Sequence, residues 1–187
     1  MTPESIQVRK PNNFLTGKET ASMLHHYDMT RKPVLEKTLG HEDTRINFHS
    51  IDELENYIKY VKEISREKGI NLTGINFVSA SYPENTTQGI ANYQTIMFMP
   101  TTEINGKNIG FDPLQSTSEK IVTMKETLIK YVYNWIYDSK EDYDNRKVTT
   151  EALLKNFQNK DTIDDGEIGV GNHGSLIPPG DPSQTGF

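Results

Sequence analysis

Residues 50–69, SIDELENYIKYVKEISREKG, have the pattern of an amphipathic helix that begins at a serine and ends at a glycine. Ser50 and Glu53 stand at the spacing of a capping box, in which each side chain accepts a hydrogen bond from the other residue's backbone N–H. Apolar residues then recur at helical spacing, and charged residues fill the opposite side. Gly69 tolerates the left-handed conformation that ends a helix. The segment is therefore expected to be a helix that packs on a sheet.

Two strands are expected next, over residues 74–81 (GINFVSAS) and 93–101 (YQTIMFMPT). Both are rich in β-branched, aromatic or long apolar residues, and both lie between turn formers. The second places apolar groups on both of its sides, which favours a central or doubly covered strand. Asn105 and Gly106 are typical of a tight hairpin turn because both positions need positive φ, so a third strand should return after them.

Short helices are expected before this centre. Thr16 and Glu19 repeat the capping-box spacing and open a helix that runs through about Tyr27. Pro33 suits the first turn of a second short helix, which Gly40 can end.

The longest helix is expected after the hairpin. Ser116 and Glu119 again stand at capping-box spacing, and the apolar stripe that follows continues to Trp135. The stripe consists of Ile121, Met124, Leu128, Val132 and Trp135, widened by Tyr131 and Ile136. This helix and the one over residues 50–69 are the two main core contributors, so Trp135 and Phe98 are expected to be buried.

These elements predict an α+β fold: a small antiparallel sheet of about three or more strands packed against two main amphipathic helices. We expect an N-terminal extension over residues 1–14, a single domain over 15–158 and a flexible Asp/Gly/Pro-rich tail over 159–187. An apolar fraction of 34% and a mean hydropathy of -0.67 agree with a chain that contains much loop and tail.

Composition excludes several classes of function. The chain has no cysteine, which removes disulfides, thiol nucleophiles and thiolate metal sites. Its net charge of -6 with mixed signs gives no broad basic field, so nucleic acid is not an expected partner. No apolar run has the length of a signal or a membrane span, so we expect a soluble, cytoplasmic protein without a membrane partner.

Two motif matches do not hold in their context. Residues 169–174, GVGNHG, satisfy GxGxxG, but no strand precedes them and no helix follows, as a dinucleotide site requires. The acidic residues near Asp164 lack the alternating ligand positions of a calcium loop. We therefore expect neither a cofactor nor a metal.

Histidine, aspartate and arginine residues near the N-terminus form the candidate polar site: His25, His26, Asp28, Arg31 and Arg45. Imidazoles with a carboxylate suit a metal ion or proton transfer, and an arginine pair suits an anion. Adjacent histidines on a helix point about 100° apart, however, which is poor geometry for one ion. Surface histidines and arginines that pin loops are the structural alternative.

Two further places are candidate interaction sites. One is the polar loop over residues 82–92, which begins with Tyr82 and Pro83 and is either functional or merely mobile. The other is an apolar, proline-stiffened patch in the tail, which is either a peptide ligand or part of a disordered arm. That patch consists of Leu176, Ile177, Pro178 and Pro179.

The order of segments resembles a known group of proteins. YDMTRKPVLEKTLGHEDTRINFHSIDELENYIKYVKE (27–63), GINFVSASYPE (74–84), YQTIMFMPT (93–101) and NHGSLIPP (172–179) look like small uncharacterised α+β proteins of Bacteroidetes type. The resemblance implies a bacterial α+β protein. It brings no activity, cofactor or catalytic residue.

Two classes of function stay open. The favoured one is a non-enzymatic interaction or accessory protein, whose partner is another protein or a second copy of the chain. The alternative is an enzyme or small-molecule binder that uses the N-terminal His/Asp/Arg residues. Convergence of those side chains in a concave pocket would favour the alternative.

Overall fold

The computed structural model describes residues 10–86, 89–131, 133–134, 140–146, 166–172 and 175–177. The chain divides into two compact units, Met1–Asp43 and Thr44–Phe187. The predicted single domain over 15–158 spans both units and stays a prediction.

The first unit contains two helices, α1 (Gly17–Thr30) and α2 (Lys32–Leu39). Thr16 and Glu19 form the predicted capping box in front of α1. Pro33 lies in the first turn of α2, and Gly40 ends it with a φ of 78°. Both predicted short helices are therefore confirmed, although α1 continues past Tyr27 to Thr30.

The second unit is built on an antiparallel sheet of three strands in the order β2 (Leu72–Ser81), β3 (Gln94–Ile104) and β4 (Lys107–Gly110). Asn105 and Gly106 join β3 to β4 with positive φ angles of 53° and 74°, as predicted. This sheet and the helices confirm the α+β class.

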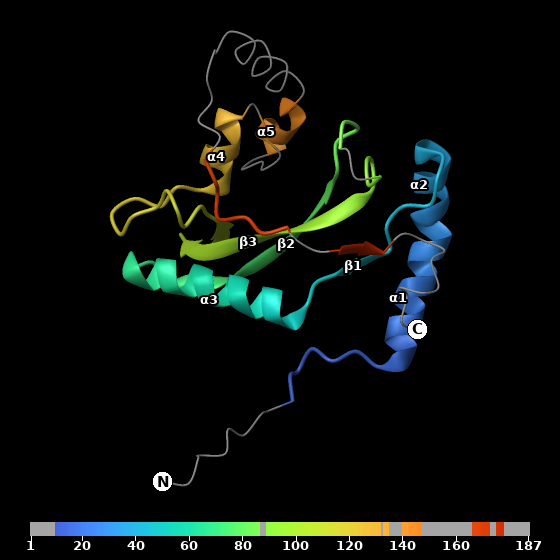
Figure 1. The fold of residues 1–187 in the computed structure, drawn as a ribbon, viewed down its shortest axis with the longest axis horizontal. Coiled ribbons are helices and arrows are strands. Elements are labelled where there is room, and N and C mark those ends of the chain that lie inside the picture. Colours follow the sequence, from blue (N-terminus) through green and yellow to red (C-terminus); the bar gives the residue numbers. More distant parts are fainter. Residues whose placement is uncertain are drawn as a thin grey trace. The chain divides into compact units, whose positions relative to one another are not determined.

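Helix α3 (Ile51–Glu67) lies along the sheet (Figure 1). The predicted box is present, since Ser50 accepts from Glu53 N–H and Glu53 accepts from Ser50 N–H. Gly69 takes the predicted left-handed conformation with a φ of 66°. The helix buries Val61 and Ser65, so its apolar side faces the core as expected.

The helix predicted to begin at Ser116 begins later. Helix α4 spans Met124–Lys130, and its N-cap is Thr123, whose capping-box partner is Glu126. The hydroxyl of Ser116 is buried and accepts a hydrogen bond from Val122 N–H. This bond holds the residues between Ser116 and Val122 in a loop. The prediction of a cap at Ser116 is therefore wrong. The prediction that this is the longest helix is also wrong, because α4 has 7 residues and α3 has 17. Val132, Trp135 and Ile136 lie outside the described residues.

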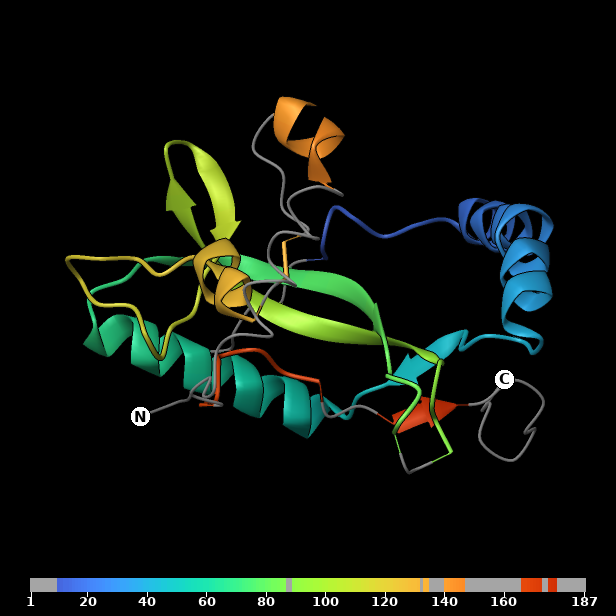
Figure 2. The same cartoon turned by 90° about the horizontal axis from the view of Figure 1, so that it is seen from above.

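Two pieces of the predicted tail pair with strands. Strand β5 (Ser175–Ile177) is antiparallel to β1 (Ile46–Phe48). Residues 166–172 run alongside β3, on the side away from β2 (Figure 2). There Gly171 and Phe98 form an antiparallel bridge. The Gly171 segment thus borders the three-stranded sheet, whereas β5 and β1 form a separate two-stranded sheet. A further short helix, α5, spans Lys140–Asp144.

The core of the second unit gathers around the sheet. Phe98 is 5% exposed, which confirms that half of the core prediction, whereas Trp135 lies outside the described residues. Among the described residues, the buried apolar side chains include Val61, Ile70, Phe98, Met99, Phe111 and Met124. Within the described part of the chain, no helix has the length and apolar character needed to cross a membrane.

Candidate functional site

Phe98 is the centre of an aromatic cluster on one face of the sheet. Its ring centroid lies 4.6 Å from that of His49, 5.8 Å from that of Tyr57 and 5.2 Å from that of Phe77. His49 comes just before the N-cap of α3, Tyr57 lies on α3, and Phe77 is paired with Phe98 across β2 and β3. Tilted and edge-to-face contacts of this kind add to the stabilisation that burial supplies.

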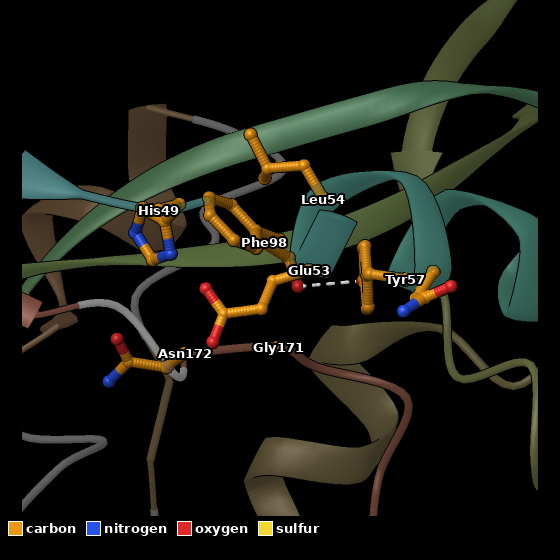
Figure 3. A pocket seen from close by; sticks show the side chains of 8 residues that line it. His49, Glu53, Leu54, Tyr57, Phe98, Gly171 and Asn172 are labelled. Atoms are coloured by element: carbon orange, nitrogen blue, oxygen red, sulfur yellow. Dashed lines mark hydrogen bonds between the residues drawn. The ribbon is translucent and has the colours of Figure 1, made fainter. Parts of the chain in front are cut away.

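A pocket of about 240 Å³ opens beside this cluster (Figure 3). Leu54 and the rings of Tyr57 and Phe98 make it mainly apolar, while Glu53 and Asn172 contribute polar groups. Its full lining is His49, Glu53, Leu54, Asn56, Tyr57, Phe98, Gly171 and Asn172. Sites for drug-sized ligands usually measure roughly 300–1,000 Å³, so this pocket fits a group about the size of one ring.

Tyr57 joins α3 both to β3 and to the segment 166–172. Its hydroxyl lies 3.0 Å from the carbonyl oxygen of Phe98 (Figure 3) and 3.0 Å from that of Gly169, and it shares its single proton between them. Burial raises the pKa of Tyr57 to about 12. The phenol is therefore a neutral structural donor at physiological pH, and it has no feature of a general base.

The two glycines of residues 169–171 are required by close packing. A Cβ atom on Gly169 would lie 2.4 Å from Pro113 Cγ, and one on Gly171 would lie 3.1 Å from the Tyr57 ring. Gly171 also exchanges two backbone hydrogen bonds with Phe98, of 2.8 Å and 3.0 Å. Gly169 and Gly171 therefore allow this segment to lie close to Pro113, Tyr57 and Phe98.

Asp112 also holds this segment. Its buried Oδ1 accepts from the backbone N–H groups of Leu114, Gln115 and Gly169, at 2.9, 3.3 and 3.4 Å. A carboxylate that organises three N–H groups of two loops serves the fold. We therefore assign Asp112 to positioning of the segment beside the pocket.

About half of the backbone N–H and C=O groups of β2 face its outer edge, on the side opposite β3. Both backbone groups of Phe98 are bonded to Gly171, so Phe98 and Phe77 form a non-hydrogen-bonded pair. The N–H and C=O of Phe77 consequently face the outer edge of β2. By the alternation of an antiparallel ladder, those of Ile75 and Ser79 do the same.

This outer edge is unpaired in the part of the chain that the structure describes, because β2 is hydrogen-bonded to β3 alone there. Strand β2 contains neither a charged residue nor proline, the usual devices that keep an edge strand from pairing. Phe77, in its middle, is 67% exposed. A strand with these properties is suited to accept another strand.

The residues of the predicted polar site belong to two units of the chain. His25, His26 and Asp28 lie on α1, and Arg31 lies between α1 and α2; of these four only Asp28 is half-buried. Arg45 belongs to the other unit. Among the described residues, no group of three or more His, Cys, Asp or Glu side chains could hold a metal ion. The role of these five residues stays a prediction.

The predicted interaction residues lie at two places. Tyr82 closes the end of the β2–β3 connection, since its N–H donates to Tyr93 and its carbonyl accepts from Asn92, while Pro83 is exposed beside it. Leu176 and Ile177 belong to β5, where they pair with β1. Pro178 and Pro179 lie outside the described residues.

Sequence reasoning missed the pocket and the open edge. The pocket is lined by His49, Tyr57 and Gly171, and Gly171 lies far from the other two in the sequence. No local sequence pattern predicts that such residues come together. The open edge had a visible signal, namely the uncharged run over residues 74–81. That run identifies an unprotected strand only once its edge position is known.

Comparisons with protein-family models, with curated proteins and with solved structures gave no match to this chain. The resemblance to proteins of Bacteroidetes type therefore stays a prediction, and the function has to be argued from the geometry alone.

Proposed function

We propose that this protein is a non-enzymatic interaction protein that binds an extended polypeptide segment as an added strand on β2. The observation that supports the proposal most is the uncharged outer edge of β2, with the exposed Phe77 in its middle. Among the described side chains, no group of three or more His, Cys, Asp or Glu residues could hold a metal ion. The predicted cytoplasmic location remains part of this proposal.

Strand addition draws on two kinds of contact. The N–H and C=O groups of Ile75, Phe77 and Ser79 supply main-chain hydrogen bonds without regard to the partner's sequence. The Phe77 side chain supplies an apolar anchor, and complete burial of such a side chain is worth about 1.5–3 kcal/mol. The partner segment should therefore be extended, free of proline at its centre, and apolar opposite Phe77.

Selection from a display library of random peptides tests the proposal, with the whole protein immobilised at low density so that copies do not meet. We expect selected peptides to have alternating β-forming residues and to bind Ser79→Ala as well as the unchanged protein. Ser79→Pro should abolish their binding, because it removes an N–H that faces the outer edge while leaving the ladder to β3 intact.

Folding of the Ser79→Pro protein is checked by circular dichroism and thermal unfolding. Should that variant misfold, Phe77→Lys replaces it, since a charge in the middle of the edge opposes pairing. Failure to select any peptide, or binders that are insensitive to both substitutions in folded protein, would contradict the proposal.

The pocket beside Phe98 favours a second candidate function, the binding of a small planar apolar molecule. Its volume of about 240 Å³ and its aromatic wall are the supporting observations. Fragment screening by NMR tests it: ring-sized fragments should shift the amide signals of Gly171 and Asn172. Unchanged signals at millimolar fragment would remove this candidate.

A further inference from the structure

We infer that the strand that pairs with β2 is the β2 strand of a second copy of this chain, antiparallel to the first, about a two-fold axis at Phe77. This inference rests on the proposed function, because it names the partner of the same edge. Three features of the edge support it: its symmetry, its lack of charge and the position of its exposed aromatic ring.

The outward-facing backbone groups are symmetric about Phe77. Ile75 and Ser79 lie two residues to either side of it, and both present their N–H and C=O to the edge by alternation. An axis at Phe77 pairs Ile75 of each copy with Ser79 of the other and pairs the two Phe77 residues. Every such pair is then of the hydrogen-bonded type.

This register also uses most of the regular part of β2. The pairing of β2 with β3 is irregular between Leu72 and Gly74 and regular from Gly74 onward. The segment 74–80 is centred on Phe77, so the whole of it can pair with its copy. A register displaced along the strand would shorten the ladder and separate the two aromatic rings.

Charge does not oppose the pairing. The chain has a net charge of -6, which disfavours contact between most surfaces of two copies. Strand β2 contains no charged side chain, so two copies can meet along it without like charges opposite one another. Two phenylalanines directly opposite form the kind of aromatic cross-strand pair that stabilises antiparallel strands.

The closed two-fold arrangement would join two three-stranded sheets into one continuous sheet and would remove both open β2 edges. Isologous contacts of this kind are the commonest in soluble homo-oligomers. The two copies of α3 would lie on the same face of the joined sheet, because the axis is perpendicular to it. Phe77 of each copy would lose most of its present exposure.

Sedimentation equilibrium over a concentration series tests the inference. We expect the full chain to reach twice its monomer mass of 21.3 kDa as concentration rises. Phe77→Lys and Phe77→Glu should each stay monomeric, because like charges would face each other across the axis. An equimolar mixture of these two variants should recover dimers, because opposite charges then meet. Asn76→Lys, whose side chain lies on the other face of β2, should leave the dimer intact.

The outcomes separate the inference from the proposed function. A protein that stays monomeric but binds selected peptides at β2 overturns the inference and leaves the function in place. A monomer that binds no peptide overturns both. A dimer that tolerates Phe77→Lys, or variants whose mixture stays monomeric, would overturn the assignment of the axis to Phe77.

Discussion

Phe77 and Phe98 face each other across β2 and β3 with ring centroids 5.2 Å apart, yet Phe77 is 67% exposed and Phe98 only 5%. Phe98 is covered because Tyr57 of α3 and Gly171 of the late segment lie against it. Phe77 lies on the strand whose outer edge is unpaired in the described part of the chain. One aromatic cluster thus connects the core to the surface that we propose for binding.

Substitution of the two rings should have very different consequences for the isolated monomer. Phe98→Ala leaves a cavity in a packed site and should lower the free energy of unfolding by about 3–5 kcal/mol. Phe77→Ala removes a mostly exposed ring and should cost less than about 1 kcal/mol. Urea unfolding at low protein concentration measures both values. Equal losses would mean that Phe77 is already covered in the monomer.

An added methyl group at Gly169 should destabilise the fold. Its Cβ would meet two atoms of the rigid Pro113 ring at 2.4 Å and 2.5 Å, so the segment or the proline has to move. We expect Gly169→Ala to lower the free energy of unfolding by about 1–3 kcal/mol. Gly17→Ala is the control, because a methyl group there would meet no atom of a more distant residue within 4 Å. Equal stability of both variants would contradict the observed close packing.

Tyr57 should make stability depend on alkaline pH. Burial raises its pKa from 10.0 to about 12, so the folded state holds the phenol proton more tightly than the unfolded state does. This stabilisation is complete below pH 10 and is lost as pH rises through 12. Tyr57→Phe should lack this part of the pH dependence and should cost about 0.5–1.5 kcal/mol at neutral pH.

Chemical unfolding of both proteins on either side of pH 10 checks the prediction for Tyr57, since that is the ordinary pKa of the phenol. Parallel decreases in the stability of the unchanged protein and of Tyr57→Phe would show that another group is responsible.

Asp112 should matter through its hydrogen bonds. Asp112→Ala leaves the N–H groups of Leu114, Gln115 and Gly169 without their acceptor and should cost about 3 kcal/mol. Asp112→Asn keeps an acceptor oxygen and should cost less. Urea unfolding compares the two variants. If the alanine variant is as stable as the asparagine variant, Asp112 does not have this positioning role.

The start of α4 at Thr123 should be visible in the titration of Glu126. The backbone N–H and the hydroxyl of Thr123 donate to Glu126 Oε2 at 2.7 Å and 2.9 Å, which lowers the pKa of Glu126 below 4.5. The resulting stabilisation is present above pH 4.5 and is lost as pH falls through the lowered pKa. Thr123→Val removes the hydroxyl, so the pKa should rise and the helix should lose about 1 kcal/mol.

Carbon-detected NMR of the Glu126 carboxyl group measures this pKa in both proteins. An unchanged value in Thr123→Val would mean that the capping box is not formed in solution, and it would reopen the question of where the helix begins.

Local signals in the sequence predicted much of the fold. Ser50 with Glu53 and Thr16 with Glu19 mark helix starts because a capping box needs only four consecutive residues. Asn105 and Gly106 mark the hairpin because few other pairs adopt two positive φ angles. Each of these features depends on residues that are no more than three positions apart in the sequence.

The start of α4 was harder to predict because the sequence contains two equivalent N-cap patterns. Ser116 with Glu119 and Thr123 with Glu126 have the same spacing. In the loop that follows Asp112, the Ser116 hydroxyl accepts a hydrogen bond from Val122 N–H. Ser116 is therefore not available as a helix cap, and the helix begins at the cap Thr123. A tertiary hydrogen bond of this kind has no counterpart in local pattern.

The candidate site was not predictable for the same reason. Its pocket depends on the pairing of Phe98 with Gly171, which no periodicity reveals. The open edge depends on strand order, since β2 is the terminal strand of the three-stranded sheet in the described part of the chain. The residues singled out near the N-terminus were chosen for their chemical type alone, and their role stays a prediction.

Amide-resolved hydrogen exchange at Phe77 and Val78 tests the open edge of β2 most directly. In dilute monomer the N–H of Phe77 should exchange rapidly, because it faces the outer edge, while that of Val78 should be protected by its bond to β3. At concentrations that favour association, Phe77 should become as protected as Val78. Strong protection of Phe77 in dilute monomer would show that the edge is already paired, and it would contradict the account.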